Sequence, residues 1–305
     1  MTTTSCESMT RNLGAFEHLI WLIDQWSPRH FLLAARIEGA PLSPDGLCGA
    51  FLQAQRRHSA LRTSIQVGPG GVPHFEPSDA PVKLRVVDRS GDLQWQSEAE
   101  AELATPFETS KGPLLRATLV QGEAASELIL AARHSIGDGI SAMYLVRDLL
   151  EAMEGHRLGE LPRRESMEEL AGATPMERGT HLPPPALALQ VDRPGAAKIA
   201  STEIEPPQLE LVLSRCRRER TTLEGALLAA IMLEGPIDGC LAPVNVRHLC
   251  PPVADDFGLY ISSGTALLDR NSAADSGRSR ARPGLAWFVR WSSKGCKRGM
   301  RAWPR

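Results

Sequence analysis

Residues 127–150, ELILAARHSIGDGISAMYLVRDLL, set how this chain folds around its most informative side chain. Residues 127–133, which are apolar from Leu128 to Ala132, predict a strand. From Ile140 onward, apolar side chains recur at helical spacing and predict a helix. Between the two elements lie His134, Asp138 and Gly139 in the pattern H-x-x-x-D-G. Asp138 can cap the following helix, and Gly139 permits a tight turn before it. We therefore expect His134 at a strand end, presented to a cleft rather than buried.

Outward from this stretch, strand and helix patterns alternate through residues 1–153. Ser43 offers an N-cap with Pro44 at the first helical position, so a helix is expected to begin there. Residues 61–67 alternate apolar and polar side chains, which is typical of a strand with one buried face. Further strands are expected at residues 31–39, 82–88 and 114–121, and a further helix at residues 92–103. This alternation predicts a mixed α/β fold.

The pattern changes after residue 155. Six prolines fall between residues 155 and 200, and this composition predicts a linker. Thr221 and Glu224 fit the S/T-x-x-E capping box, so a helix is expected to open there. Residues 240–246 predict another strand.

Composition argues against several classes of protein. The chain is 42% hydrophobic and 23% charged with a formal net charge of -2, so no nucleic-acid partner is expected. No apolar run is long enough for a membrane span, and the N-terminus lacks the basic and apolar regions of a secretory signal. A cytoplasmic protein is expected. The six cysteines form no CxxC pair, so neither a zinc ribbon nor a thioredoxin-like site is expected.

Three other short motifs accompany the H-x-x-x-D-G pattern. In chain order they are Arg57-His58-Ser59-Ala60-Leu61-Arg62, Gly112-Pro113-Leu114-Leu115-Arg116 and Pro243-Val244-Asn245-Val246-Arg247. With residues 133–139 they resemble the motifs of the condensation-domain and chloramphenicol-acetyltransferase-like superfamily of acyltransferases. The resemblance covers about residues 10–265. Pro251-Pro252 follows the last motif, as in stand-alone members of the superfamily. The chain therefore resembles the ester-forming branch that includes phthiocerol dimycocerosyl transferase.

The resemblance implies two α/β lobes in a V arrangement, with His134 in the channel between them and the second lobe truncated. His134 occupies the position of the family's general base, which acts on the acceptor. Asp138 is expected to form an ion pair with Arg247, and Gly139 and Asn245 are expected to be structural. The first histidine of the family motif is replaced by Arg133. Because neighbouring strand residues point to opposite faces, this replacement is expected to affect His134 little.

The resemblance also implies an acyl thioester donor, either acyl-CoA or a phosphopantetheine thioester on an acyl carrier protein, and a small-molecule alcohol or amine acceptor. No tightly bound cofactor and no metal are expected. The chain has no G-x-S-x-G elbow and no cysteine in a nucleophile context, so direct transfer without an acyl-enzyme is expected. His58 is expected to be structural, because its motif lies where a helix enters a strand. A lone histidine more often satisfies a structural hydrogen bond than acts in catalysis, and this is the alternative role for His134. The rival hypothesis is therefore a catalytically dead remnant or a carrier-protein-binding module.

The expected organisation is an N-terminal lobe at 1–154, a linker at 155–200, a partial C-terminal lobe at 201–268 and an atypical basic tail at 269–305. The tail has ten Lys or Arg against two Asp, a charge of +8, whereas the rest of the chain carries -10. A frameshifted reading would produce this loss of Glu and gain of Arg, Trp and Ser. The tail is expected to lie outside any packed core, because its sequence has no sustained period of 2 or 3.6.

Overall fold

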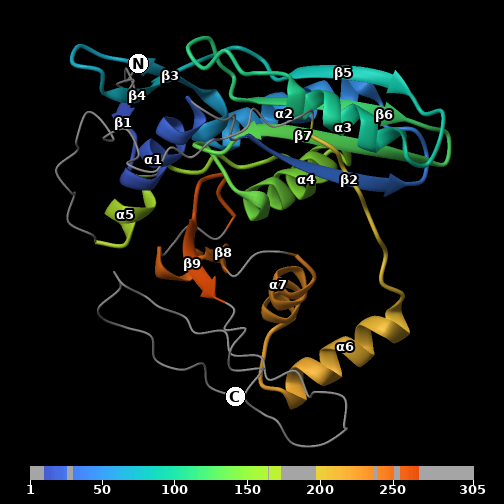
Figure 1. The fold of residues 1–305 in the computed structure, drawn as a ribbon. Coiled ribbons are helices and arrows are strands. Elements are labelled where there is room, and N and C mark those ends of the chain that lie inside the picture. The colour runs from blue at the N-terminus through green and yellow to red at the C-terminus, as the bar shows by residue number, and fades with distance from the viewer. Residues whose placement is uncertain are drawn as a thin grey trace, which may run out of the picture. The chain divides into compact units, whose positions relative to one another are not determined.

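A four-stranded sheet carries the stretch that ends at His134 (Figure 1). Its strands, in spatial order, are β2 (His30–Glu38), β7 (Ala125–Arg133), β6 (Leu115–Gln121) and β5 (Lys83–Asp88). β7 is antiparallel to both neighbours, and β5 joins β6 in parallel. Every residue of β7 is buried. This central strand is therefore covered on both faces, as its apolar run from Leu128 to Ala132 requires.

Helices cover the two faces of this sheet. α2 (Pro44–Arg57) and α4 (Gly139–Met153) pack against each other and contribute to one apolar cluster with β6 and β7. α3 (Gln94–Ala104) contributes Ala99 to a second cluster with Val120 and Ile129. Because Ile129 and its neighbours along β7 alternate between the two clusters, α3 covers the opposite face.

The computed structural model describes residues 10–25, 30–163, 165–172, 197–235, 239–250 and 255–267. A second sheet has the order β1-β4-β3, and a third pairs β8 with β9 in antiparallel register. The remaining elements in chain order are β1 (Arg11–Asn12), α1 (Ala15–Asp24), the 3-10 helix η1 (Ser59–Arg62), β3 (Thr63–Val67), β4 (Pro73–Pro77), α5 (Met167–Leu170), α6 (Pro206–Arg218), α7 (Leu223–Glu234), β8 (Gly239–Asn245), the 3-10 helix η2 (Arg247–Leu249) and β9 (Ile261–Leu267).

The helix caps show where local sequence decided local structure. The side chain of Ser43 accepts a hydrogen bond from the Gly46 backbone N–H, with Pro44 at the start of α2, so the predicted cap is confirmed. The prediction for α7 was one residue early, because Thr222 rather than Thr221 caps the helix and accepts from the Gly225 N–H. The expected strand at residues 61–67 also begins later, since η1 takes up its first two positions.

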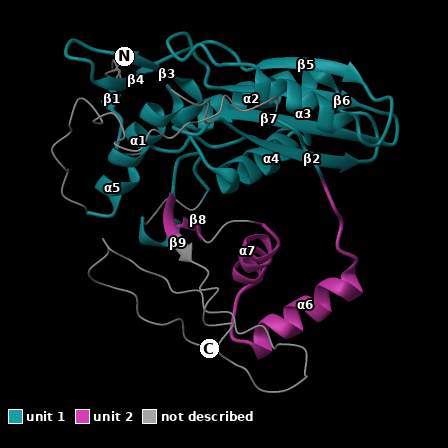
Figure 2. Cartoon of the chain, in the orientation of Figure 1, with its two compact units in different colours: residues 1–200, 247–260 teal, residues 201–246, 261–305 magenta. Residues whose placement is uncertain are grey.

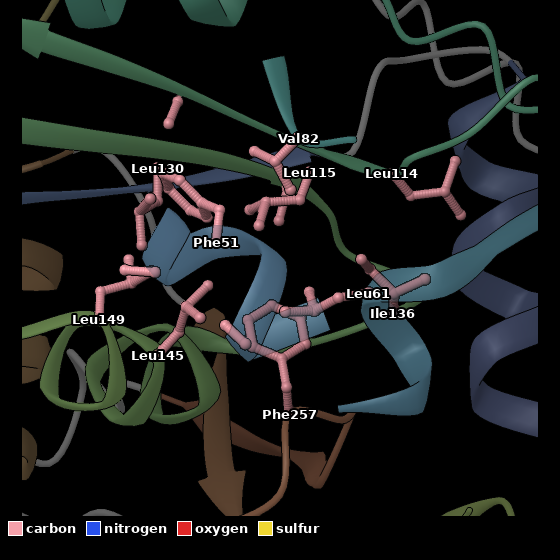
Figure 3. Close-up of a cluster of buried hydrophobic side chains, with 14 of the residues drawn as sticks. Phe51, Leu61, Val82, Leu114, Leu115, Leu130, Ile136, Leu145, Leu149 and Phe257 are labelled. Carbon is pink, nitrogen blue, oxygen red and sulfur yellow. The ribbon is translucent and has the colours of Figure 1, made fainter. Parts of the chain in front are cut away.

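The main apolar core lies between β7 and the α2–α4 pair. Phe51 of α2, Leu130 of β7 and Leu145 of α4 are all buried within it. Figure 3 shows these side chains facing one another, and it also shows Phe257, which enters the same cluster from a segment far away in sequence. Phe257 is 1% exposed. The segment around Phe257 is therefore part of the core around the motif.

The chain divides into two compact units (Figure 2). The first contains residues 1–200 and 247–260, and the second contains residues 201–246 and 261–305. Residues 247–260, which were expected in the C-terminal lobe, thus pack with the N-terminal unit, because they contribute Phe257 to its core. The tail at 269–305, most of the predicted linker and Pro251-Pro252 lie outside the described residues. The V arrangement and the truncated second lobe stay predictions.

Within the part of the chain that the structure describes, no helix has the length and apolar character needed to cross a membrane.

Candidate functional site

His134 follows directly after β7 in a turn that leads into α4. Its Nδ1 atom lies 2.9 Å from the carbonyl oxygen of Gly137. A carbonyl oxygen can only accept a hydrogen bond, so Nδ1 carries the proton and donates it. In the neutral imidazole the lone pair then belongs to Nε2. The turn thus presents Nε2 of His134 as a proton acceptor.

The ring of His134 is also held by an aromatic contact. The Phe31 ring of β2 lies with its centroid 5.0 Å from that of the imidazole, at an interplanar angle of 50°. The side chain of His134 is half-buried. An aromatic wall on one side and a hydrogen bond at Nδ1 restrict the rotation of this ring.

Asp138 joins the loop of His134 to the segment around Arg247. Its carboxylate caps α4 by accepting from the Ser141 N–H at 2.8 Å, and it accepts from the Tyr260 N–H at 2.9 Å. The Arg247 Nη2 atom lies 3.4 Å from Asp138 Oδ1, and both side chains are buried. The predicted ion pair is therefore confirmed. The Arg247 guanidinium also donates to the backbone carbonyl of Asp256 at 3.0 Å.

Ser141 is a member of this network that the sequence motif did not single out. Its hydroxyl oxygen accepts from Arg247 Nη2 at 2.6 Å and from the Gly258 N–H at 3.1 Å. The single hydroxyl proton faces Asp138 Oδ1 at 2.9 Å and the Gly258 carbonyl at 2.5 Å. Ser141 is fully buried, so its hydroxyl joins Asp138, Arg247 and the Gly258 backbone in one network that water does not reach.

Replacing Ser141 with alanine is expected to lower the free energy of unfolding by about 1–3 kcal/mol, because it leaves buried donors of Arg247 and Gly258 without their hydroxyl partner. Urea unfolding followed by circular dichroism measures this loss. Ser97, exposed on α3, is the matched control, and Ser97→Ala is expected to change the unfolding free energy by no more than about 0.5 kcal/mol. Equal effects of the two substitutions would contradict the role of the Ser141 hydroxyl.

The glycine that the fold requires in the motif is Gly137, not Gly139. A Cβ atom on Gly139 would meet no atom within 4 Å, and Gly139 is absent from the glycines with positive φ. The structure therefore shows no conformational or steric need for glycine at position 139. A Cβ on Gly137 would overlap Cε1 of Phe257 and lie only 2.8 Å from its Cζ. The close approach of Phe257 is what excludes a side chain at Gly137.

A hollow that opens to solvent lies in the first unit next to this loop. Ile136, two residues after His134, contributes to its wall together with Phe257 and Tyr260. Polar side chains such as Thr63 and Glu165 line it as well. Across the described residues, no three His, Cys, Asp or Glu side chains gather as a metal site would need.

Comparison with protein-family models finds a match to the condensation domain over residues 20–169. This part of the chain belongs to the condensation-domain family. The match includes the motifs at residues 57–62, 112–116 and 134–139.

Curated relatives of the chain include large peptide synthetases. One of the linear gramicidin synthase proteins of Brevibacillus parabrevis is 29% identical over 259 residues, which cover 72% of this chain and 5% of that protein. Nonribosomal peptide synthetase kk1B of Curvularia clavata is 29% identical over 286 residues, which cover 80% of this chain and 2% of that protein. The chain thus spans only a few hundredths of the length of these relatives.

Solved condensation domains share the fold. The first condensation domain of the calcium-dependent antibiotic synthetase has a TM-score of 0.61 at 15% identity, covering 85% of this chain and 70% of that one. Polyketide synthase associated protein 5 from Mycobacterium tuberculosis has a TM-score of 0.59 at 18% identity, covering 85% and 66%. The mixed α/β condensation-domain fold expected from the sequence is confirmed.

Arg133 stands where the condensation-domain motif has its first histidine. Its guanidinium is buried and forms an ion pair with the buried carboxylate of Asp24 at the end of α1. Burial lowers the pKa of Arg133 to about 10, so the side chain keeps its charge at neutral pH. Asp24 neutralises that charge. No local pattern signals this partner, because Asp24 lies far from Arg133 in the sequence.

His58 was expected to be structural, and its contacts agree with that role. It is fully buried, its Nε2 lies 2.9 Å from Asp148 Oδ2, and its Nδ1 accepts from the Phe257 N–H at 3.2 Å. Burial opposes protonation of His58, but contacts with Asp148 and Asp256 outweigh it and raise the pKa.

Asn245 lies in β8 opposite Ile261, in the second unit. Its structural role near the site stays a prediction.

Proposed function

We propose that this chain transfers an acyl group from a thioester to an alcohol or amine, with His134 as the general base. One observation carries the proposal. The Gly137 carbonyl holds the proton of His134 on Nδ1, which leaves Nε2 as the basic atom. This imidazole lies in a family motif within the region matched by the condensation-domain model.

The chemistry follows from the proton balance. Histidine is the side chain that exists in neutral form at physiological pH and can still accept a proton. Nε2 of His134 takes the proton from the acceptor hydroxyl or amine as its oxygen or nitrogen bonds to the thioester carbonyl carbon. When the C–S bond breaks, the imidazolium returns that proton to the departing thiolate. The products are an ester or amide and a free thiol, and no acyl-enzyme is formed.

The nature of the donor and acceptor is the finer part of the proposal. The synthetase relatives favour a phosphopantetheine thioester on a carrier protein as donor, with acyl-CoA as the alternative. The acceptor is a small molecule, and ester formation was the outcome expected from the Pro251-Pro252 resemblance. The predicted V arrangement would let donor and acceptor enter from opposite sides of a channel that contains His134.

Mixing the purified chain with acyl-CoA and acyl-phosphopantetheine thioesters, each with a panel of alcohols and amines, is expected to yield an ester or amide together with free thiol. Mass spectrometry identifies the product, and a thiol reagent measures the release. Thioester hydrolysis without product in every combination, or no thiol release at all, would favour the rival hypothesis of a catalytically dead remnant. The same mixtures without protein provide the background.

A further inference from the structure

We propose that Phe257 is a positioning residue for His134. Its ring packs on Gly137 and thereby holds the carbonyl that determines which nitrogen of His134 is basic. The consequence for rate rests on the proposed function, whereas the consequence for the imidazole tautomer does not.

The contact between Phe257 and Gly137 is direct. A Cβ built on Gly137 would overlap Cε1 of Phe257 and lie 2.8 Å from its Cζ. Phe257 is 1% exposed and belongs to the core cluster that also contains Ile136. Figure 3 shows Phe257 and Ile136 drawn in this same cluster. Because packed interiors have little free volume, the ring leaves the peptide at Gly137 little room to move.

Phe257 is itself anchored through its backbone. Its N–H donates to Nδ1 of His58 at 3.2 Å, and Nε2 of His58 donates to Asp148 at 2.9 Å. Asp148 also accepts from Arg147 at 2.8 Å and lies 2.8 Å from Arg57. In the neutral ring, Nε2 carries the proton that faces Asp148, and Nδ1 then accepts from the Phe257 N–H. This chain of buried contacts links α2 and α4 to the segment 255–260.

The series of contacts ends at the reacting nitrogen. His58 holds the Phe257 backbone, the Phe257 ring abuts Gly137, and the Gly137 carbonyl accepts from Nδ1 of His134. If this peptide rotates, His134 loses the partner that selects its tautomer, and part of the population then carries the proton on Nε2. An imidazole in that form cannot accept a proton from the acceptor at Nε2.

The first test uses nitrogen NMR of the histidine ring, which reports the tautomer without any substrate. The wild-type chain is expected to show His134 with Nδ1 protonated. Gly137→Ala, whose methyl group overlaps the Phe257 ring, is expected to shift His134 toward a mixture of tautomers. The double substitution Gly137→Ala/Phe257→Leu, which removes the overlapping ring atoms, is expected to restore the wild-type signal. A signal unchanged in Gly137→Ala would overturn the inference.

Two substitutions of His58 test the anchor. In His58→Asn the amide oxygen lies near the position of Nδ1 and can still accept from Phe257, whereas in His58→Gln the amide lies near Nε2 and cannot. His58→Gln is therefore expected to disturb the His134 tautomer more than His58→Asn. An equal disturbance by both would contradict the anchoring role.

Phe51→Leu is the matched control for loss of core volume, because Phe51 is buried in the same cluster but lies on α2. It is expected to lower the free energy of unfolding and leave the nitrogen signal of His134 unchanged. A shift of that signal as large as in Gly137→Ala would show that any loss of core packing changes the tautomer, and would contradict a specific role for Phe257.

In the transfer assay, Gly137→Ala is expected to lower kcat by about 10–100-fold with little change in KM. A misplacement of a catalytic group by about 1 Å can lower the rate by about 100-fold. A shifted tautomer in a chain with no detectable transfer would contradict the proposed function alone.

Discussion

Replacing His134 with alanine is expected to lower the rate of acyl transfer by about 10²–10⁴-fold, because the acceptor loses the base that takes its proton. The loss is expected in kcat and kcat/KM alike, since the proton moves only in the transition state. The measurement is the rate of ester or amide formation at saturating thioester, followed by mass spectrometry. Circular dichroism of the variant establishes that the fold is retained.

The matched control for this variant is His156→Ala. His156 is an exposed histidine in the loop after α4, and its substitution is expected to leave the rate unchanged. A His134→Ala variant that keeps more than about a third of the wild-type rate, while folding normally, is incompatible with a general base that contributes about 10²-fold or more.

Replacing Asp138 with alanine is expected to lower the free energy of unfolding by about 3–5 kcal/mol. The variant leaves the buried Arg247 guanidinium without the carboxylate 3.4 Å away, and it removes the N-cap of α4 and the acceptor of the Tyr260 N–H. Urea unfolding gives the free energy, provided that the slope of the transition is unchanged. Such a loss is a large fraction of the stability of an ordinary domain.

Two further variants make this prediction specific. Asp79→Ala removes a carboxylate that is exposed in a loop, and it is expected to cost no more than about 0.5 kcal/mol. The double variant Asp138→Asn/Arg247→Met is expected to lose less free energy than the sum of its two single variants, because the second change removes the guanidinium that the first deprives of the Asp138 carboxylate. Strictly additive losses would show that the two side chains do not interact.

Much of the fold around His134 could be predicted from the sequence. The strand before it, the helix after it and the cap at Asp138 follow from the apolar pattern of residues 127–150 and one carboxylate at the right position. Ser43 and Pro44 started α2 where expected. These features depend on residues within one or two turns of one another, and local spacing is what a sequence records directly.

The sequence predicted element boundaries and long-range partners less well. The expected strand at 61–67 lost its first two residues to η1, and the cap of α7 moved from Thr221 to Thr222. Both errors concern element boundaries, where two adjacent residues have similar propensities and packing decides between them. The ion pair between Asp138 and Arg247 was expected only through the family resemblance, since the two side chains are 109 residues apart.

The amino-acid sequence by itself predicted three features. These are the mixed α/β alternation, the position of His134 at a strand end and its place in a condensation-domain motif. Three-dimensional packing was needed to learn that Gly137 rather than Gly139 must be glycine, that Ser141 joins the Asp138 network and that Asp24 neutralises Arg133. Each of these depends on a side chain brought in from another segment. Main-chain conformation follows from neighbours along the chain, but burial and partnership follow from which distant segments pack together.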